Sequence, residues 1–145
     1  MSYGCTMRTS LELADLGGFL SEPRVAVLAT LRPDGAVQLS PVWHEWRDGE
    51  FNLWIGIDDV KARHLRRDPR ATLVVAGSEP PLKGVELRGR ARFIQDDVTE
   101  TGVRIASRYV GRIEGERFAG TLVGESVVVR LEPGELRVWD FADEY

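Results

Sequence analysis

The chain has 145 residues and carries 19 Lys and Arg against 23 Asp and Glu, a formal net charge of -4. This length suits a single domain over residues 1–145, because a domain near this size buries about 70% of the surface of its unfolded chain. The acidic balance argues against nucleic-acid and membrane partners, and one cysteine, Cys5, excludes an internal disulfide, as expected of a soluble cytoplasmic protein.

The first third of the chain predicts a short helix and then three antiparallel strands. Thr9 and Glu12 have the spacing of a capping box, and leucines at helical intervals carry the expected helix to Leu20. Strands are expected over residues 24–31, 37–46 and 51–57. Turn residues at 32–35 and 48–49 separate these strands, so they are expected to pair in chain order as a meander.

The middle of the chain predicts a helix between further strands. The helix is expected over residues 60–67 and the strands over residues 71–76 and 85–94. Pro69 ends the helix because proline cannot continue its hydrogen-bond ladder. The last of these strands alternates apolar and charged residues, so one face is expected to be buried. The outward row is Arg88, Arg90 and Arg92. It is either a solvated face or an anionic-ligand surface used across a dimer.

The last third predicts one helix and two strands. Asp97 and Glu100 have capping-box spacing, and apolar residues at helical intervals lead to Gly111, where this helix is expected to end. A connecting segment through Phe118 and Leu122 follows. Strands are expected over residues 127–131 and 136–141, with a turn at residues 132–135 between them.

Together these elements indicate a mainly β fold with peripheral helices. Six or seven antiparallel strands at turn-rich spacing are typical of a small barrel. A parallel nucleotide-binding sheet is not expected, because the sequence has neither a Gly-x-Gly-x-x-Gly turn after a strand nor a Walker loop.

Positive charge is concentrated directly after the third predicted strand. Residues 61–70, KARHLRRDPR, hold five of the 19 basic side chains of an acidic protein. Lys and Arg at the start of a helix add charge-assisted hydrogen bonds to its unpaired N–H groups, so this segment predicts an anionic ligand such as a phosphate. A solvated helix face is the alternative, and it suits Arg66, Arg67 and Arg70 better than Lys61 and Arg63.

Five segments in order resemble the pyridoxamine 5'-phosphate oxidase-like split β-barrel superfamily. They are VAVLATLRPDGAVQLSPVWHEW, FNLWIGI, KARHLRRDPRATLVV, VELRGRARF and VVVRLEPGELRVWDF. The likeness spans about residues 19–141 and is greatest to the flavin- and deazaflavin-dependent oxidoreductases of the B subgroup. It implies a split β-barrel and a homodimer with the cofactor ring between subunits. The ending VWDFADEY lacks the arginine-and-histidine signature of true pyridoxamine phosphate oxidases, so oxidation of vitamin B6 is not expected.

The resemblance also implies a cofactor site and a reaction. The implied cofactor-binding residues are Ser40, Pro41, Val42 and Trp43 along the ring, and Lys61 and Arg63 at the phosphate. The cofactor is coenzyme F420, with FMN as the alternative, and the reaction is hydride transfer between reduced F420 and a small organic acceptor. No catalytic side chain is expected, because the cofactor supplies the reactive atom. Asp58 and Asp59 precede Lys61, and carboxylates beside a phosphate repel it unless they face away.

Other interpretations of these residues remain open. A non-catalytic carrier of flavin or haem is one, with His44 as the candidate haem ligand. His44 and His64 lack the supporting ligands of a metal site, so none is expected. The four tryptophans suit a core or a dimer interface, and Trp43 and Trp139 are the candidates for a pocket wall. Nucleic-acid binding through the basic segment is the weakest interpretation, because no aromatic residues alternate with its charges.

Overall fold

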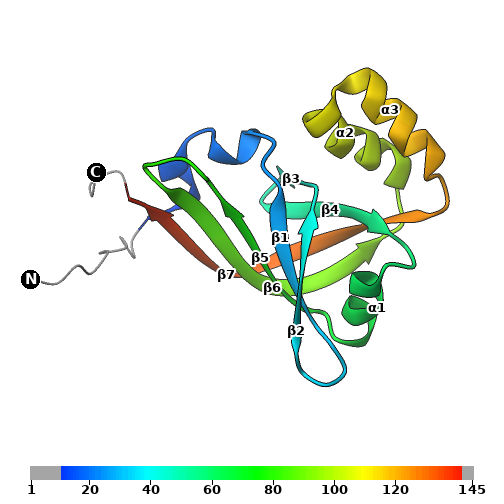
Figure 1. Cartoon of the computed structure of the whole chain (residues 1–145), viewed down its shortest axis with the longest axis horizontal. Coiled ribbons are helices and arrows are strands. Elements are labelled where there is room, and N and C mark those ends of the chain that lie inside the picture. The colour runs from blue at the N-terminus through cyan, green and yellow to red at the C-terminus, as the bar shows by residue number, and fades with distance from the viewer. Residues whose placement is uncertain (1–10, 142–145) are drawn as a thin grey trace, which may run out of the picture.

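The structure, a computed structural model, describes residues 11–141 as one curled sheet with helices at its edges (Figure 1). The strands are β1 (Ala26–Leu31), β2 (Val37–Val42), β3 (His44–Arg47), β4 (Glu50–Gly56), β5 (Arg70–Ala76), β6 (Lys83–Ile94) and β7 (Ser126–Asp140). The helices are α1 (Val60–Arg67), α2 (Val98–Val110) and α3 (Arg112–Thr121), after the 3-10 helices Leu13–Leu16 and Phe19–Ser21. Helix α1 has the bounds that the sequence predicts.

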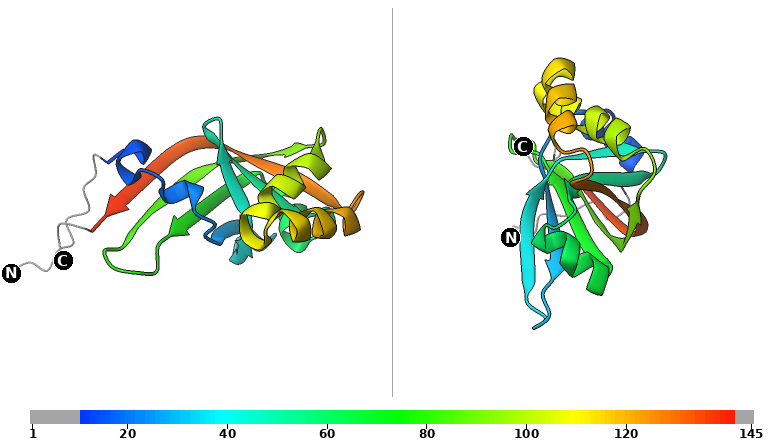
Figure 2. Two further views of the ribbon diagram at one scale, coloured as in Figure 1. Left: turned by 90° about the horizontal axis from the view of Figure 1, so that it is seen from above. Right: turned by 90° about the vertical axis from the view of Figure 1, so that its right-hand side faces the viewer.

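The seven strands run in the order β2-β1-β5-β6-β7-β4-β3, and every neighbouring pair is antiparallel. Strands β2 and β3 therefore lie at opposite ends of this order, although only Trp43 separates them in the chain. Both facts hold only because the sheet curls and brings its two ends together, as the two views in Figure 2 show. The mainly β, barrel-like architecture predicted from the sequence is confirmed.

The strand predicted over residues 37–46 is in fact two strands. Its first half pairs with β1, from Val42 opposite Ala26 to Val37 opposite Leu31, as the predicted hairpin requires. Its second half, β3, pairs with β4 across the predicted turn at residues 48–49. The two halves lie at opposite ends of the strand order, so the single middle strand of the expected meander is wrong. Alternation along a strand is the same whichever strand it pairs with, and the sequence therefore gave no sign of the switch at Trp43.

The interior of the curled sheet holds the main hydrophobic core. Its largest fully buried side chains include Leu28, Phe51, Leu53, Leu73, Leu87 and Leu131. Each such side chain contributes about 1.5–3 kcal/mol relative to an exposed one. Along β6 the predicted alternation is confirmed, since Val85 and Leu87 are buried whereas the row Arg88, Arg90 and Arg92 is exposed.

Helices α2 and α3 lie side by side at one end of the sheet and bury a second, smaller cluster (Figure 1). Helix α2 ends at Gly111, as predicted. Helix α3 was not predicted, because Gly115 and Gly120 lower its helix propensity. Gly115 is nevertheless suited to this place, since a Cβ atom there would lie 2.5 Å from the Ser107 hydroxyl oxygen. Close packing against α2 thus outweighs propensity. Within residues 11–141 no helix has the length and apolar character needed to cross a membrane.

Strand β7 is continuous, so the turn predicted at residues 132–135 is wrong. The segment pairs with β6 on both sides of a register shift, with Glu135 opposite Arg88 and Pro133 opposite Gly89. The chain absorbs the extra residue, Gly134, as a β-bulge. Gly89 makes room for it, because a Cβ atom there would clash with the Glu132 carbonyl oxygen.

Two predicted helix starts also differ from the structure. The helix expected up to Leu20 is divided into two 3-10 turns, and Gly17 between them has a φ of 59°. Cys5 and Thr9 lie outside the described residues, and so does the capping box predicted on Thr9. At the start of α2, Asp97 has a φ of 55° and makes no side-chain capping bond, so the capping box predicted there is wrong.

Candidate functional site

A cavity of about 310 Å³ opens where the two ends of the curled sheet approach each other. The lining comes from β2, β4, β7, the start of α1, α3 and the connections beside them. The lining residues are Pro41, Val42, Trp43, Trp54, Ile55, Gly56, Asp59, Lys61, Phe118, Leu122 and Ser126. The cavity is therefore a product of the tertiary fold, with an apolar side and a charged end.

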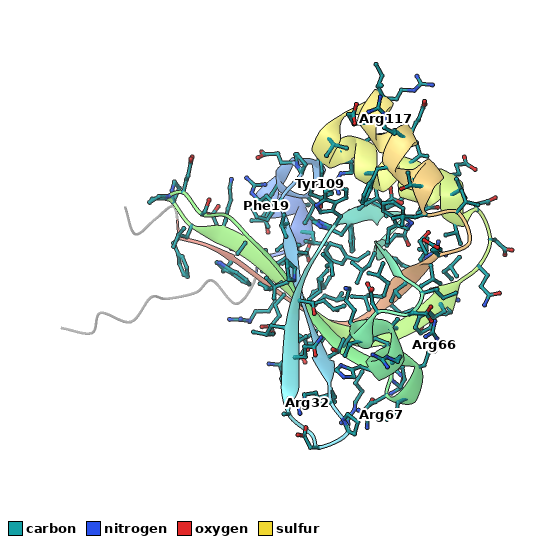
Figure 3. The ribbon with its side chains drawn as sticks, turned by 45° about the vertical axis from the view of Figure 1, so that its right-hand side comes forward. Phe19, Arg32, Arg66, Arg67, Tyr109 and Arg117 are labelled. Carbon is teal, nitrogen blue, oxygen red and sulfur yellow. The ribbon has the colours of Figure 1, made fainter. Side chains whose placement is uncertain are left out.

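Aromatic rings form the apolar side of the cavity. Trp43 stacks on Tyr109 with ring centroids 4.8 Å apart and an interplanar angle of 6°, and Phe118 lies 5.8 Å from Trp43. The Tyr109 hydroxyl donates to the Arg24 carbonyl oxygen at 2.9 Å and accepts the His44 backbone N–H at 3.1 Å. Figure 3 shows Tyr109 beside the segment that carries Phe19. Because two hydrogen bonds hold the Tyr109 hydroxyl, the Tyr109 ring gives Trp43 a fixed surface to stack on.

Trp54 separates the cavity from helix α2. It is 8% exposed, and its ring meets Phe118 edge-on at a centroid distance of 5.6 Å. On its other side the ring lies against the backbone of α2, where a Cβ atom at Gly102 would be 2.7 Å from Trp54 Nε1. Only glycine allows this approach. Trp43, Trp54 and Phe118 together give the cavity flat, apolar walls suited to a planar ring.

The charged end of the cavity is an ion pair at the start of α1. The Nζ atom of Lys61 donates to Asp59 Oδ2 at 2.9 Å, and the same oxygen accepts the Gly56 backbone N–H at 3.0 Å. Burial by itself raises the pKa of the Asp59 carboxyl, but the bonds from Lys61 and Gly56 outweigh it and hold the pKa below its usual value of 3.8. The Asp59 carboxylate is therefore charged at neutral pH.

The cavity brings together four of the six predicted cofactor-binding residues. Pro41, Val42, Trp43 and Lys61 line it. The other two, Ser40 and Arg63, do not: the Ser40 hydroxyl accepts a 3.5 Å hydrogen bond from Gln38, and Arg63 is exposed on α1. Residues two apart in a helix face different sides, which explains why Lys61 and Arg63 diverge.

The remaining arginines of the basic segment bond other parts of the protein or a neighbouring carboxylate. Arg66 donates to the Ile57 carbonyl oxygen at 2.8 Å, and Arg67 donates to the Leu31 carbonyl oxygen. Arg70 pairs with Asp68 at 2.7 Å. Figure 3 shows Arg66 and Arg67 on α1. The charge cluster seen in the sequence therefore divides into one cavity lysine and several structural arginines.

Both histidines are buried. His44 is 0% exposed, its Nδ1 atom lies 3.0 Å from the Tyr109 hydroxyl, and its ring faces Phe51. Burial lowers the pKa of His44 to about 4, and the positive charge of Arg108 is the second cause of this lowering. His64 lies 2.9 Å from the Thr30 hydroxyl. Neither ring lines the cavity, so the suggested haem ligand, His44, is directed into the interior.

Several cavity residues were not singled out from the sequence as ligand contacts. Phe118 and Leu122 have the i, i+4 spacing of one helix face, which could have predicted both α3 and an apolar wall. Asp59 directly precedes a predicted helix, a position where a carboxylate often accepts backbone N–H bonds. Trp139, expected as a possible pocket wall, packs instead against Gly84, where a Cβ atom would lie 2.5 Å from its ring.

Known proteins resemble this chain over nearly its whole length. A family model described as pyridoxamine 5'-phosphate oxidase matches residues 15–140. A conserved hypothetical protein from Mycobacterium tuberculosis superposes with a TM-score of 0.79 at 29% identity, covering 92% of this chain and 87% of that one. Sequence and fold therefore agree across the strands and helices that build the cavity.

Two further solved structures share the fold at lower identity. One, described as an F420 reductase, has a TM-score of 0.67 at 21% identity and covers 82% of this chain and 93% of its own. The haem storage protein HutZ from Vibrio cholerae has a TM-score of 0.73 at 19% identity, covering 96% of this chain and 100% of its own. At these identities the likeness establishes the architecture alone.

Proposed function

This chain belongs to the pyridoxamine 5'-phosphate oxidase family, and from that premise we propose that it transfers hydride between reduced coenzyme F420 and a small organic acceptor. The observation that carries the proposal is the cavity in which aromatic walls and one lysine converge. A solved structure described as an F420 reductase has the same architecture, so the fold is compatible with deazaflavin chemistry.

The residues of the cavity fit one end of such a cofactor. Flat apolar surfaces at Trp43, Trp54 and Phe118 suit a planar ring, and Lys61 offers an ammonium group to an anionic arm. A volume of about 310 Å³ lies at the lower end of the range for ligand pockets. A ring system fills such a space, and the rest of a larger cofactor would extend outside it.

The protein contributes position, shape and exclusion of water. Bound F420 would supply two-electron hydride chemistry, which suits reduction of activated double bonds. Pro41 and Val42 would bound the ring along the end of β2, while the stacked Trp43 restricts its tilt. Phe118, which is 45% exposed, lies where it can cover the ring and keep water away. None of these roles requires an acid or base among the side chains.

A second copy of the chain is proposed as the partner that completes the site. Strand β2 stands at one end of the hydrogen-bonded order, and its outward side chains Val37 and Leu39 are 58% and 66% exposed. Pro41 continues the same row into the cavity. A partner that covers this apolar row would also cover the open side of the cavity. Light scattering on the purified protein is expected to give a dimer, and Leu39→Asp a monomer; a monomeric wild-type protein would refute this arrangement.

Cofactor titration tests the proposal directly. We expect F420 to bind saturably at micromolar concentration, followed by its fluorescence, and to bind more tightly than FMN or haemin. Trp43→Leu is expected to weaken binding about tenfold or more, because it removes a stacked aromatic wall. Trp139→Leu is the matched control, since Trp139 does not line the cavity.

Turnover separates an enzyme from a carrier. Reduced F420 bound to the protein is expected to be oxidised when an activated alkene is added, which restores the absorbance of the oxidised cofactor. Saturable binding without oxidation by any acceptor would make the protein a carrier. Tighter binding of haemin than of either flavin-like cofactor would overturn the proposed cofactor class.

A further inference from the structure

The two charges at the charged end of the cavity cancel, so this end has no net charge. Among the described residues that line the cavity, the charged side chains are Asp59 and Lys61, and they lie 2.9 Å apart. The arginines of the basic segment lie outside this lining and do not offset the carboxylate. A ligand that approaches Lys61 therefore meets a cation that is already paired.

Asp59 is also held in place by the backbone. Its Oδ2 atom accepts the Gly56 N–H at 3.0 Å in addition to the Lys61 bond. A Cβ atom at position 56 would lie 2.6 Å from Asp59 Oδ1, so the carboxylate occupies space that only glycine leaves free. Movement of Asp59 away from an incoming anion would break the Gly56 bond. The negative charge is thus a fixed part of the site.

We propose that Asp59 selects the charge of the phosphate that the cavity accepts, favouring a singly charged phosphodiester over a doubly charged phosphate monoester. This inference rests on the proposed function and refines it. An ammonium group has three donors, so Lys61 can bond a ligand oxygen while it keeps Asp59. Because the Asp59–Lys61 pair is neutral overall, it adds little attraction for a second negative charge on the ligand phosphate. The free-energy cost of removing an ion from water, by contrast, rises steeply with the charge of the ion. F420 contains a phosphodiester, and FMN ends in a monoester.

The test compares two neighbouring carboxylates. Asp59→Asn removes the charge but keeps an oxygen that can accept the Gly56 N–H, and Asp59→Ser is a second variant with a good helix-capping side chain. Asp58→Asn is the control, because it makes the same change of net charge at an exposed residue outside the cavity lining. Each protein is titrated with F420, FMN and riboflavin at about pH 8, where a monoester with a second pKa of about 6 is doubly charged.

We expect Asp59→Asn to raise FMN affinity about tenfold, the effect of one nearby charge at intermediate dielectric, and F420 affinity about threefold. Riboflavin has the same ring as FMN but no phosphate, so its affinity is expected to stay unchanged. Asp58→Asn is expected to leave all three affinities close to those of the wild-type protein.

The outcomes separate this inference from the proposed function. An FMN gain no larger than that of riboflavin, or an equal gain in Asp58→Asn, overturns the role of Asp59 while F420 binding still supports the proposed function. Failure of every protein to bind F420 overturns the proposed function, and the contrast between FMN and riboflavin then decides the charge effect alone.

Discussion

Two ion pairs in this molecule, Glu45–Arg104 and Asp59–Lys61, differ in how deeply their carboxylates are buried. Glu45 on β3 is 6% exposed at its side chain, and Arg104 of α2 binds both of its oxygens, at 2.6 and 2.7 Å. Asn52 adds a third bond at 2.9 Å. Asp59 at the cavity is 41% exposed, and Lys61 contacts one of its oxygens at 2.9 Å.

The difference indicates which pair is structural and which can meet a ligand. Glu45 is almost fully buried, so removing Arg104 would leave a buried negative charge without its cation. The Asp59–Lys61 pair keeps donors and surface for another anion, and water already screens it. We therefore expect the buried Glu45–Arg104 pair to stabilise the fold and the more exposed Asp59–Lys61 pair to contact a ligand.

The largest expected effect breaks the enclosed pair. Arg104→Ala is expected to lower the free energy of unfolding by about 3 kcal/mol, because Glu45 stays buried without its cation. Urea unfolding at neutral pH measures this loss. Arg112→Ala is the control, since Arg112 forms an exposed pair with Glu116 whose loss is expected to cost about 0–1 kcal/mol. Equal losses in the two variants would show that enclosure does not distinguish the pairs.

Acidification should weaken the same enclosed region through His44. The folded-state pKa of His44, about 4, lies below its ordinary value of 6.5, so the unfolded chain takes up the proton first. Stability from the neutral ring is complete above about pH 6.5 and decreases as the pH falls towards 4, by at most about 3 kcal/mol. Urea unfolding at several pH values measures this slope. His44→Gln is expected to flatten it, and an unchanged slope would assign the acid sensitivity to other groups.

A methyl group added where α2 packs against Trp54 should lower the free energy of unfolding moderately. Gly102→Ala places a Cβ atom against the rigid Trp54 ring, so a loss of about 1–3 kcal/mol is expected from overpacking. Gly120→Ala in α3 is the matched control, because nothing lies within 4 Å of a Cβ atom there. That variant is expected to be neutral or to gain up to about 1 kcal/mol. Thermal unfolding and tryptophan fluorescence follow both, and similar results would disprove close contact at Trp54.

The smallest expected effect on stability is at the cavity. Lys61→Ala is expected to change the free energy of unfolding by about 0–1 kcal/mol, because its pair is partly exposed, while it weakens F420 binding. Arg63→Ala, outside the cavity lining, is expected to weaken binding less. Urea unfolding and cofactor titration on both variants provide the comparison. Equal losses of affinity would show that Arg63 also contacts the cofactor phosphate, as the family resemblance implies.

Much of the fold followed from local patterns in the sequence. Helix α1 has its predicted bounds because Pro69 and the preceding polar residues act on their immediate neighbours. The alternation in β6 predicted its exposed arginines, since side chains of a strand face opposite sides in turn. The resemblance implied a site of six residues, of which Pro41, Val42, Trp43 and Lys61 line one cavity and Ser40 and Arg63 do not.

Three-dimensional packing decided the rest. The break at Trp43 follows from the curl of the sheet, which places β2 and β3 at opposite ends of the strand order. Helix α3 depends on the close packing of Gly115 against Ser107 of α2, and the bulge in β7 depends on Gly89 of β6. The pairing of Asp59 with Lys61 likewise required Gly56 to leave space for the carboxylate. The sequence by itself thus determined the family and most strands, because these depend on neighbours in the chain. Only the tertiary structure determined that the cavity lysine is already paired, because this depends on how the start of α1 packs against the end of β4.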